Sequence, residues 1–179
     1  MDENIKKFIK VLAEKTARDI IEQVSKDKEL TILISKYLED ENEHFRSKTF
    51  FSGNHTWVKI TDEWNGKVGL TDYAIRNLKD RAKLYTDKVG SPVRILEPFG
   101  VVETWTLMFD LYSPIAGRII ALNEKALENV GQIDSNTWLV EVHPLNHNAL
   151  MKELELLMDE KKYTHHITEK EEQLHREKI

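Results

Sequence analysis

Between Phe50 and His143, short runs of β-forming residues alternate with residues that favour turns. Val89-Gly90-Ser91-Pro92 and Ala116-Gly117 are two of the turn-forming stretches. Asn65-Gly66 has apolar residues on both sides, a pattern typical of a tight β-hairpin turn. Many short strands at close spacing predict a small β-sandwich or barrel, because such strands bury their apolar side chains by packing one sheet against another.

Helical patterns flank this β-rich region. Over residues 1–48, apolar side chains recur at three- and four-residue steps in two stretches, which predicts a helical hairpin. A further helix is predicted after Pro144, with Leu150 and Leu154 on its apolar side. Residues 159–179 are charged and sparse in apolar side chains, which predicts a frayed helical tail. We therefore expect a helical extension at 1–48, a β domain with a C-terminal helix at 49–158, and a charged tail at 159–179.

The composition argues against several functional classes. The chain has 26 basic and 31 acidic residues, a net charge of −5, without the clustered basic face that nucleic-acid binding requires. It has no cysteine, which excludes disulfides and thiol chemistry. No window approaches the run of about twenty apolar residues that spans a membrane, and the N-terminus does not resemble a secretory signal. We expect a cytoplasmic protein that binds neither nucleic acid nor membrane.

No sequence motif indicates catalysis or metal binding. The chain contains no nucleophile elbow, phosphate-binding loop or dinucleotide-binding glycine pattern, so we expect no catalytic residue. An enzyme with an unrecognised site remains a weaker alternative. His165, His166 and His175 lie in the charged tail, and adjacent helical histidines point to different faces, so we expect no metal site.

Five segments between His55 and Tyr163 occur together in one order and spacing. They are 55–58 (HTWV), 68–74 (VGLTDYA), 100–104 (GVVET), 110–114 (DLYSP) and 138–140 (WLV). In this arrangement they resemble the glycine cleavage system H-protein family, relatives of lipoyl and biotinyl carrier domains. The resemblance implies a mainly β fold. It would be a lipoyl-domain-like flattened β-sandwich, or barrel-sandwich hybrid, with short flanking helices after the N-terminal helical hairpin.

The resemblance also exposes a difference at the position that carries the cofactor. In the family, a lysine three residues after the glutamate is lipoylated, and its arm carries an aminomethyl group between enzymes. Counted from Glu103, that position is Thr106, and no lysine lies between Val89 and Lys125. A threonine hydroxyl is a weak nucleophile without an adjacent base, and its side chain lacks the reach of lysine. We therefore expect no lipoate and no other cofactor on this chain.

The residues around Thr106 are unusually apolar for a hairpin turn that faces water. They are Trp105, Leu107, Met108 and Phe109, and an exposed patch of this kind usually marks an interface. Either the N-terminal helical hairpin covers the turn, or the turn and Glu103 bind a partner, or the turn is simply exposed to solvent. That partner would be an enzyme that handles lipoylated carriers, or a second copy of the chain.

The function predicted from these features is a non-lipoylated, non-catalytic protein-interaction or regulatory module. The alternative is a functional lipoyl and aminomethyl carrier of the glycine cleavage system that uses another attachment residue.

Overall fold

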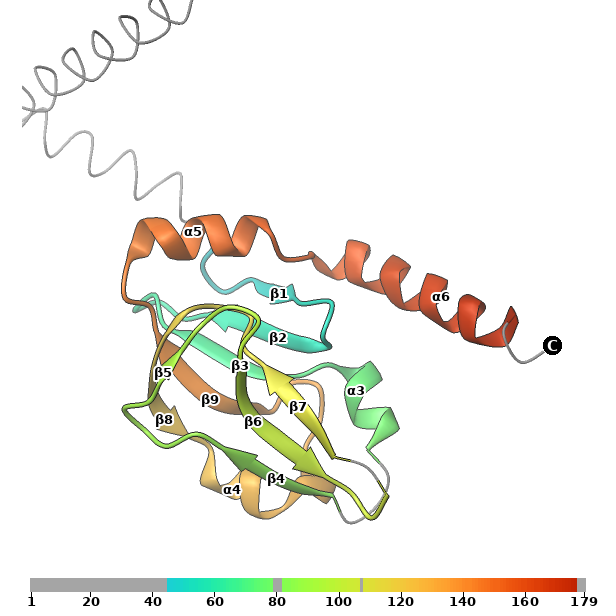
Figure 1. Cartoon of the computed structure of the whole chain (residues 1–179). Helices are drawn as coiled ribbons and strands as arrows, with labels where there is room; N and C mark the ends of the chain where they lie inside the picture. Colours follow the sequence, from blue (N-terminus) through green and yellow to red (C-terminus); the bar gives the residue numbers. More distant parts are fainter. Residues whose placement is uncertain (1–44, 79–81, 107, 177–179) are drawn as a thin grey trace, which may run out of the picture. The chain divides into compact units, whose positions relative to one another are not determined.

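The computed structural model describes residues 45–78, 82–106 and 108–176 (Figure 1). The chain divides into two units, Met1–His44 and Phe45–Ile179, and all described residues lie in the second. The helical hairpin predicted for residues 1–48 therefore lies outside the described residues, apart from a short turn that leads into the first strand. None of the described helices is long and apolar enough to cross a membrane.

Two antiparallel sheets form the body of the described unit (Figure 1). The larger sheet has the strand order β1-β2-β3-β9-β8-β5, and the smaller sheet has the order β4-β6-β7. The strands are β1 (Thr49–Phe51), β2 (Thr56–Ile60), β3 (Gly66–Leu70), β4 (Lys83–Thr86), β5 (Pro92–Val93), β6 (Pro98–Glu103), β7 (Met108–Tyr112), β8 (Gly117–Leu122) and β9 (Trp138–His143). The mainly β, two-sheet fold predicted from the sequence is confirmed.

Short helices connect and cover the sheets. They are α3 (Asp72–Asn77), α4 (Glu124–Glu128), the 3₁₀ helix η1 (Val130–Gln132), α5 (His147–Glu155) and α6 (Glu160–Arg176). The helix expected after Pro144 is α5. It begins where the Asn146 side chain accepts hydrogen bonds from the backbone N–H groups of Asn148 and Ala149, an N-cap that satisfies otherwise unpaired donors. Leu150 and Leu154 are buried, as their helical spacing predicted.

The core lies between the two sheets. The larger sheet contributes fully buried side chains from its central strands, among them Val58, Ile60, Val68, Ile119, Leu139, Val140 and Val142. The smaller sheet contributes Leu84, Phe99, Val102 and Leu111, and α5 adds its two buried leucines. Burial of each such side chain stabilises the fold by roughly 1.5–3 kcal/mol before the entropy of ordering is counted. This core anchors β6 and β7 and so fixes the hairpin that they form.

The loop between β2 and β3 differs from the tight turn that Asn65-Gly66 predicts. Gly66 is the first residue of β3 and pairs with Ile60, so the connection spans residues 61–65. The residue with positive φ is Trp64, at 62°. A Cβ atom at Gly66 would collide with the buried side chains of Ile115 and Val58. Gly66 is therefore required by close packing in the core rather than by turn geometry.

Helix α6 lies where the sequence predicted a frayed helical tail, and its first turns pack on the domain. Tyr163 and Ile167, four residues apart on one helical face, are only 8% and 9% exposed. Just before the helix, Met158 and Phe51 exchange backbone hydrogen bonds of 2.8 and 2.9 Å. The Tyr163 ring stacks on Phe51 with 4.9 Å between centroids. These two residues and this bridge, together with the hydrogen bond from the Tyr163 hydroxyl to Thr71, dock the first turns of an otherwise charged helix on the domain.

Candidate functional site

Strands β6 and β7 form the hairpin that the sequence predicted around Thr106. Glu103 pairs with Met108 and Val102 pairs with Phe109, so residues 104–107 make the turn. Of these turn residues, Leu107 lies outside the described part of the chain. Buried Val102 and Leu111 hold the two strands in the core, and the turn projects from the end of the sheet (Figure 1).

Three apolar side chains at this end are exposed. Trp105 is 76% exposed, Met108 is 67% exposed and Phe109 is 37% exposed. We call these three residues the hairpin patch. Thr106 is also exposed. The idea that the N-terminal helical hairpin covers this turn concerns residues outside the described ones and stays a prediction.

Two residues of strand β4, Lys83 and Tyr85, also lie at this end of the sheet. They were not among the site residues predicted from the sequence. The register of β4 places Lys83 opposite Glu103, and Tyr85 opposite Val101. Lys83, Glu103 and Met108 therefore form the last cross-strand row, with side chains on one face. Tyr85 lies in the next outward-facing row and is 49% exposed. Alternation along KLYT could have shown that Lys83 and Tyr85 share a face, but local sequence carries no signal for the pairing of β4 with β6.

The turn itself does not fit a lipoyl group held as an amide. No lysine amine lies between Val89 and Lys125, and the described side-chain hydroxyls of the turn belong to Thr104 and Thr106. Lys83 supplies an exposed amine at the same end of the same sheet.

A second polar cluster, also missed by sequence reasoning, joins α6 to the domain. His55 Nδ1 lies 2.9 Å from the Tyr163 hydroxyl, and His55 Nε2 lies 3.2 Å from Lys170 Nζ. The Tyr163 hydroxyl donates to Thr71 Oγ1 at 2.8 Å, and Thr71 in turn caps α3. Burial, followed by the positive charge of Lys170 and the nearby His166, lowers the pKa of His55 to about 4. The His55 ring is therefore uncharged near neutral pH, where its two nitrogens join α6 to the β domain.

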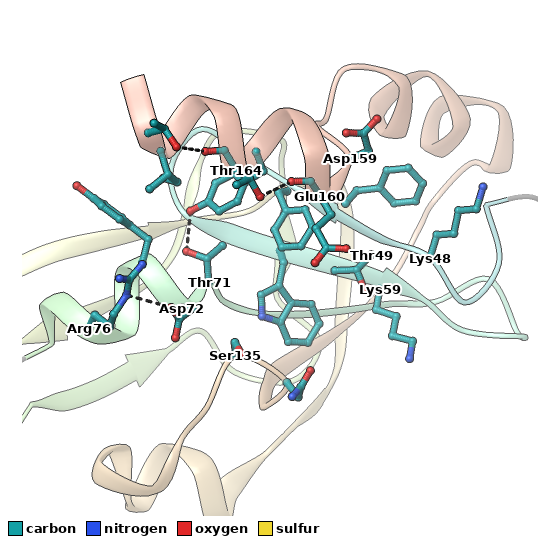
Figure 2. Close-up of a pocket in the computed structure, with 18 of the residues that line it drawn as sticks. Lys48, Thr49, Lys59, Thr71, Asp72, Arg76, Ser135, Asp159, Glu160 and Thr164 are labelled. Carbon is teal, nitrogen blue, oxygen red and sulfur yellow. Dashed lines mark hydrogen bonds and ion pairs between the residues drawn. The ribbon is translucent and has the colours of Figure 1, made fainter. Parts of the chain in front are cut away.

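Beside this cluster lies an open pocket of about 920 Å³ between α6, the β1–β2 edge and α3 (Figure 2). Its lining mixes cationic side chains such as Lys48 and Lys59 with anionic ones such as Asp159 and Glu160. Arg76 is paired with Asp72 at 3.0 Å. The lining residues include no nucleophile activated by a hydrogen-bonded base, so their arrangement supports no defined reaction. Within the described residues, no group of three or more histidine or acidic side chains could hold a metal ion.

Comparisons with known proteins agree with this fold. A family model described as "Glycine cleavage H-protein" matches residues 49–170. The chain is 30% identical over 117 residues to the "Probable glycine cleavage system H protein" of Pyrococcus abyssi, covering 64% of this chain and 85% of that protein. It is 31% identical over 121 residues to the "Glycine cleavage system H protein" of Rhodospirillum rubrum, covering 65% and 93%.

A solved structure shares the same architecture. The crystal structure of a glycine cleavage system H protein from Mycobacterium marinum matches with a TM-score of 0.56 and 25% identity. The match covers 65% of this chain and 94% of that one.

These matches correct the prediction that the chain carries no cofactor. The family model and the curated relatives point to lipoate, the group that members of this family carry. The prediction of no lipoate rested on Thr106 and on the absence of lysine between Val89 and Lys125, and neither observation excludes attachment elsewhere in the chain. The assignment of Thr106 to the lipoyl-lysine position, and a binding role for Glu103, Trp105, Thr106, Leu107, Met108 and Phe109, stay predictions.

Proposed function

Because this chain belongs to the glycine cleavage H-protein family, we propose that it is a non-catalytic subunit that docks on a partner enzyme through its hairpin patch. Proteins of this family are carriers rather than catalysts, and a carrier works by binding other proteins. The single observation that supports the proposed surface is the exposure of Trp105, Met108 and Phe109 at one sheet end.

The chemistry of the patch supports a protein partner. Tryptophan is among the residues most often found at the energetic centre of interfaces, where it fills an apolar pocket. Burial of side chains of this size contributes roughly 1.5–3 kcal/mol each when they become fully covered. Tyr85, 49% exposed on the same sheet, extends the apolar surface beyond the turn.

The charges around the patch favour a different protein over a second copy. Glu103 and Asp110 lie on one face of the smaller sheet, in the first and third cross-strand rows from the turn, and Lys83 lies in the same row as Glu103. Two copies that met through this surface would bring like-charged carboxylates together, which opposes association. The partner that we propose is an enzyme of the host's glycine cleavage system. Its binding surface would have an apolar pocket bordered by basic side chains.

Binding assays with purified proteins test this proposal. Trp105→Ser should weaken binding to the host's glycine cleavage enzymes by about tenfold or more, equivalent to about 1.4 kcal/mol, and Phe109→Ser should act in the same direction. Leu145→Ser is a matched control, because Leu145 is 75% exposed but lies on the loop before α5, away from the turn (Figure 1). Unchanged binding by both patch variants would remove the proposal. Loss of self-association instead would assign the surface to a second copy.

A second candidate is a working lipoate carrier that uses an attachment residue outside the turn. The family match favours it, because lipoate is the group that the family carries. Intact-mass measurement of the protein purified from its native host tests this function. A lipoyl-sized mass increment would support it, and a homogeneous unmodified mass in cells whose other lipoyl proteins are modified would contradict it.

A further inference from the structure

We propose that helix α6 is a releasable wall of the pocket beside it, docked while His55 is neutral and freed when the His55 ring takes up a proton. The device is local, because α6 opens while the two sheets stay folded. It lies away from the hairpin patch and does not depend on whether that patch binds a partner.

Four side chains form a hydrogen-bonded chain whose donors and acceptors fit only a neutral His55 ring. An ammonium group has donors alone, so Lys170 Nζ donates to His55 Nε2 at 3.2 Å. The proton of the neutral ring therefore lies on Nδ1, which donates to the Tyr163 hydroxyl at 2.9 Å. That hydroxyl donates to Thr71 Oγ1 at 2.8 Å. A proton on Nε2 would set two donors against each other and break the first bond of the chain.

The groups of α6 that face His55 are basic or uncharged. Besides Tyr163 and Lys170 they include His166, whose ring centroid lies 6.3 Å from that of His55. The buried Nε2 of His166 has no hydrogen-bond partner among the described residues. Burial, then the positive charge of Lys170, then His166 lower the pKa of His55 to about 4. A proton on His55 would therefore meet positive charge rather than a counter-ion.

The other segments around His55 do not supply that counter-ion. Helix α3 faces it with the ring of Tyr73, at 4.6 Å between centroids. The charged residues of α3, Asp72 and Arg76, pair with each other at 3.0 Å. The segment 52–54 that precedes His55 is uncharged. Among the described groups that shift the pKa of His55, none is a carboxylate.

His55 contacts the two ends of the docked part of α6. Tyr163 and Lys170 lie seven residues apart, so they share one face of the helix, with buried Ile167 between them. Lys170 is partly buried, and the described residues that follow it are exposed. Loss of its bond to His55, with repulsion in its place, acts at the point where the helix leaves the domain.

Release of α6 would widen the pocket. The helix lines it with Tyr163, Thr164 and Ile167, and the sheet lines it with Phe51 and Trp57 (Figure 2). The Tyr163 ring stacks on Phe51, with 4.9 Å between centroids. When the helix moves away, aromatic surface on β1 and β2 becomes exposed.

Hydrogen exchange of the full-length protein, corrected for the intrinsic effect of pH on exchange, tests the device. We expect the protection of α6 to fall by about tenfold or more between pH 7 and pH 5. Each unit by which docking lowers the pKa of His55 corresponds to about a tenfold change in the docking equilibrium. Protection in β2, β3 and β9 should change much less.

Substitutions of Lys170 test the sign of the effect. In Lys170→Glu, the carboxylate can accept a hydrogen bond from protonated His55, so α6 should be better protected at pH 5 than at pH 7. Lys161→Glu makes the same charge change at an exposed position of α6 and should keep the wild-type direction. Lys170→Met removes the charge without providing an acceptor and should reduce the pH dependence.

A distance across the pocket reports the opening directly. The chain has no cysteine, so Ser135→Cys and Thr168→Cys together allow spin labels on two pocket-lining residues, one on the loop before β9 and one on α6. The distance between the labels should be short and narrowly distributed at pH 7, and longer and broader at pH 5.

Three results would overturn the inference. They are α6 protection and label distances that do not respond to pH in the wild type, equal loss of protection in α6 and the sheets, and the wild-type direction in Lys170→Glu. Protection in the sheets at pH 7 shows whether each variant is folded. Should Lys170→Glu fail to fold, an undiminished pH dependence in Lys170→Met would overturn the inference in its place.

Discussion

The ring of His55 joins helix α6 to the β domain through its two nitrogens. It contacts Tyr163 and Lys170 on α6, and Tyr163 contacts Thr71 at the start of α3. The backbone of His55 has a φ of 65°, in the left-handed region that few non-glycine residues adopt. In the sequence, His55 stands out only as part of the segment 55–58 that resembles the H-protein family. Its hydrogen-bond partners lie more than a hundred positions away in the sequence.

The lowered pKa of His55 predicts how stability depends on pH. The folded-state pKa is about 4 and the ordinary value is 6.5, so between these values the unfolded state binds the proton more readily. The contribution of His55 to stability is therefore complete above pH 6.5 and is lost as the pH falls toward 4. Urea unfolding of the wild type and of His55→Gln at several pH values between 4 and 7 measures this contribution.

The substitution should flatten the pH dependence in that window. His143→Gln, at an exposed histidine on β9, serves as the control and should keep the wild-type slope. Equal slopes in the wild type and in His55→Gln would show that protonation of His55 is not linked to folding.

Local sequence was enough to place the apolar residues around Thr106 in one hairpin, and their binding role stays a prediction. Trp105, Met108 and Phe109 lie together at one sheet end, in the hairpin that the sequence predicted. Lys83 and Tyr85 were not assigned to the site, because their position depends on which strand pairs with β6.

Helix α6 shows how little apolar surface is needed to dock an element. Its buried contacts come from Tyr163 and Ile167, supported by the backbone bridge between Phe51 and Met158. The sequence predicted a frayed helical tail here, because the segment has few apolar residues that could pack on the domain. The i, i+4 spacing of Tyr163 and Ile167 was the signal that could have identified the buried face.

Truncation of Ile167 should release α6 without unfolding the sheets. Ile167→Ala removes buried methyl groups at the helix–sheet contact, and such changes cost about 2–5 kcal/mol in fully buried sites. Because the contact is small, we expect the loss to appear as local opening. Hydrogen exchange should increase across residues 160–176 and remain slow in β2, β3 and β9.

An exposed isoleucine provides the comparison for this prediction. Ile120 on β8 is 41% exposed, so Ile120→Ala should leave exchange in α6 unchanged. Unaltered exchange of α6 in Ile167→Ala would show that other contacts hold the helix.

At the scale of the whole molecule, the two sheets share one core and present different surfaces. The smaller sheet ends in the hairpin patch, and α6 packs at β1 on the edge of the larger sheet. The patch and the pocket beside α6 are therefore built on different sheets. Because of this separation, we expect substitutions in the hairpin patch to change partner binding without unfolding the core. A change in binding can then be attributed to the patch.

The sequence by itself was sufficient to predict the class of fold, the β6–β7 hairpin, the apolar turn and the helix α5. These features depend on residues close together in the chain, through the period of apolar side chains and the conformational preferences of turn residues. Only the tertiary structure decided that Lys83 lies opposite Glu103, that Gly66 serves core packing and that α6 docks on the domain. Each of these depends on contacts between segments distant in the chain, whose pairing is set by how the two sheets close over one core.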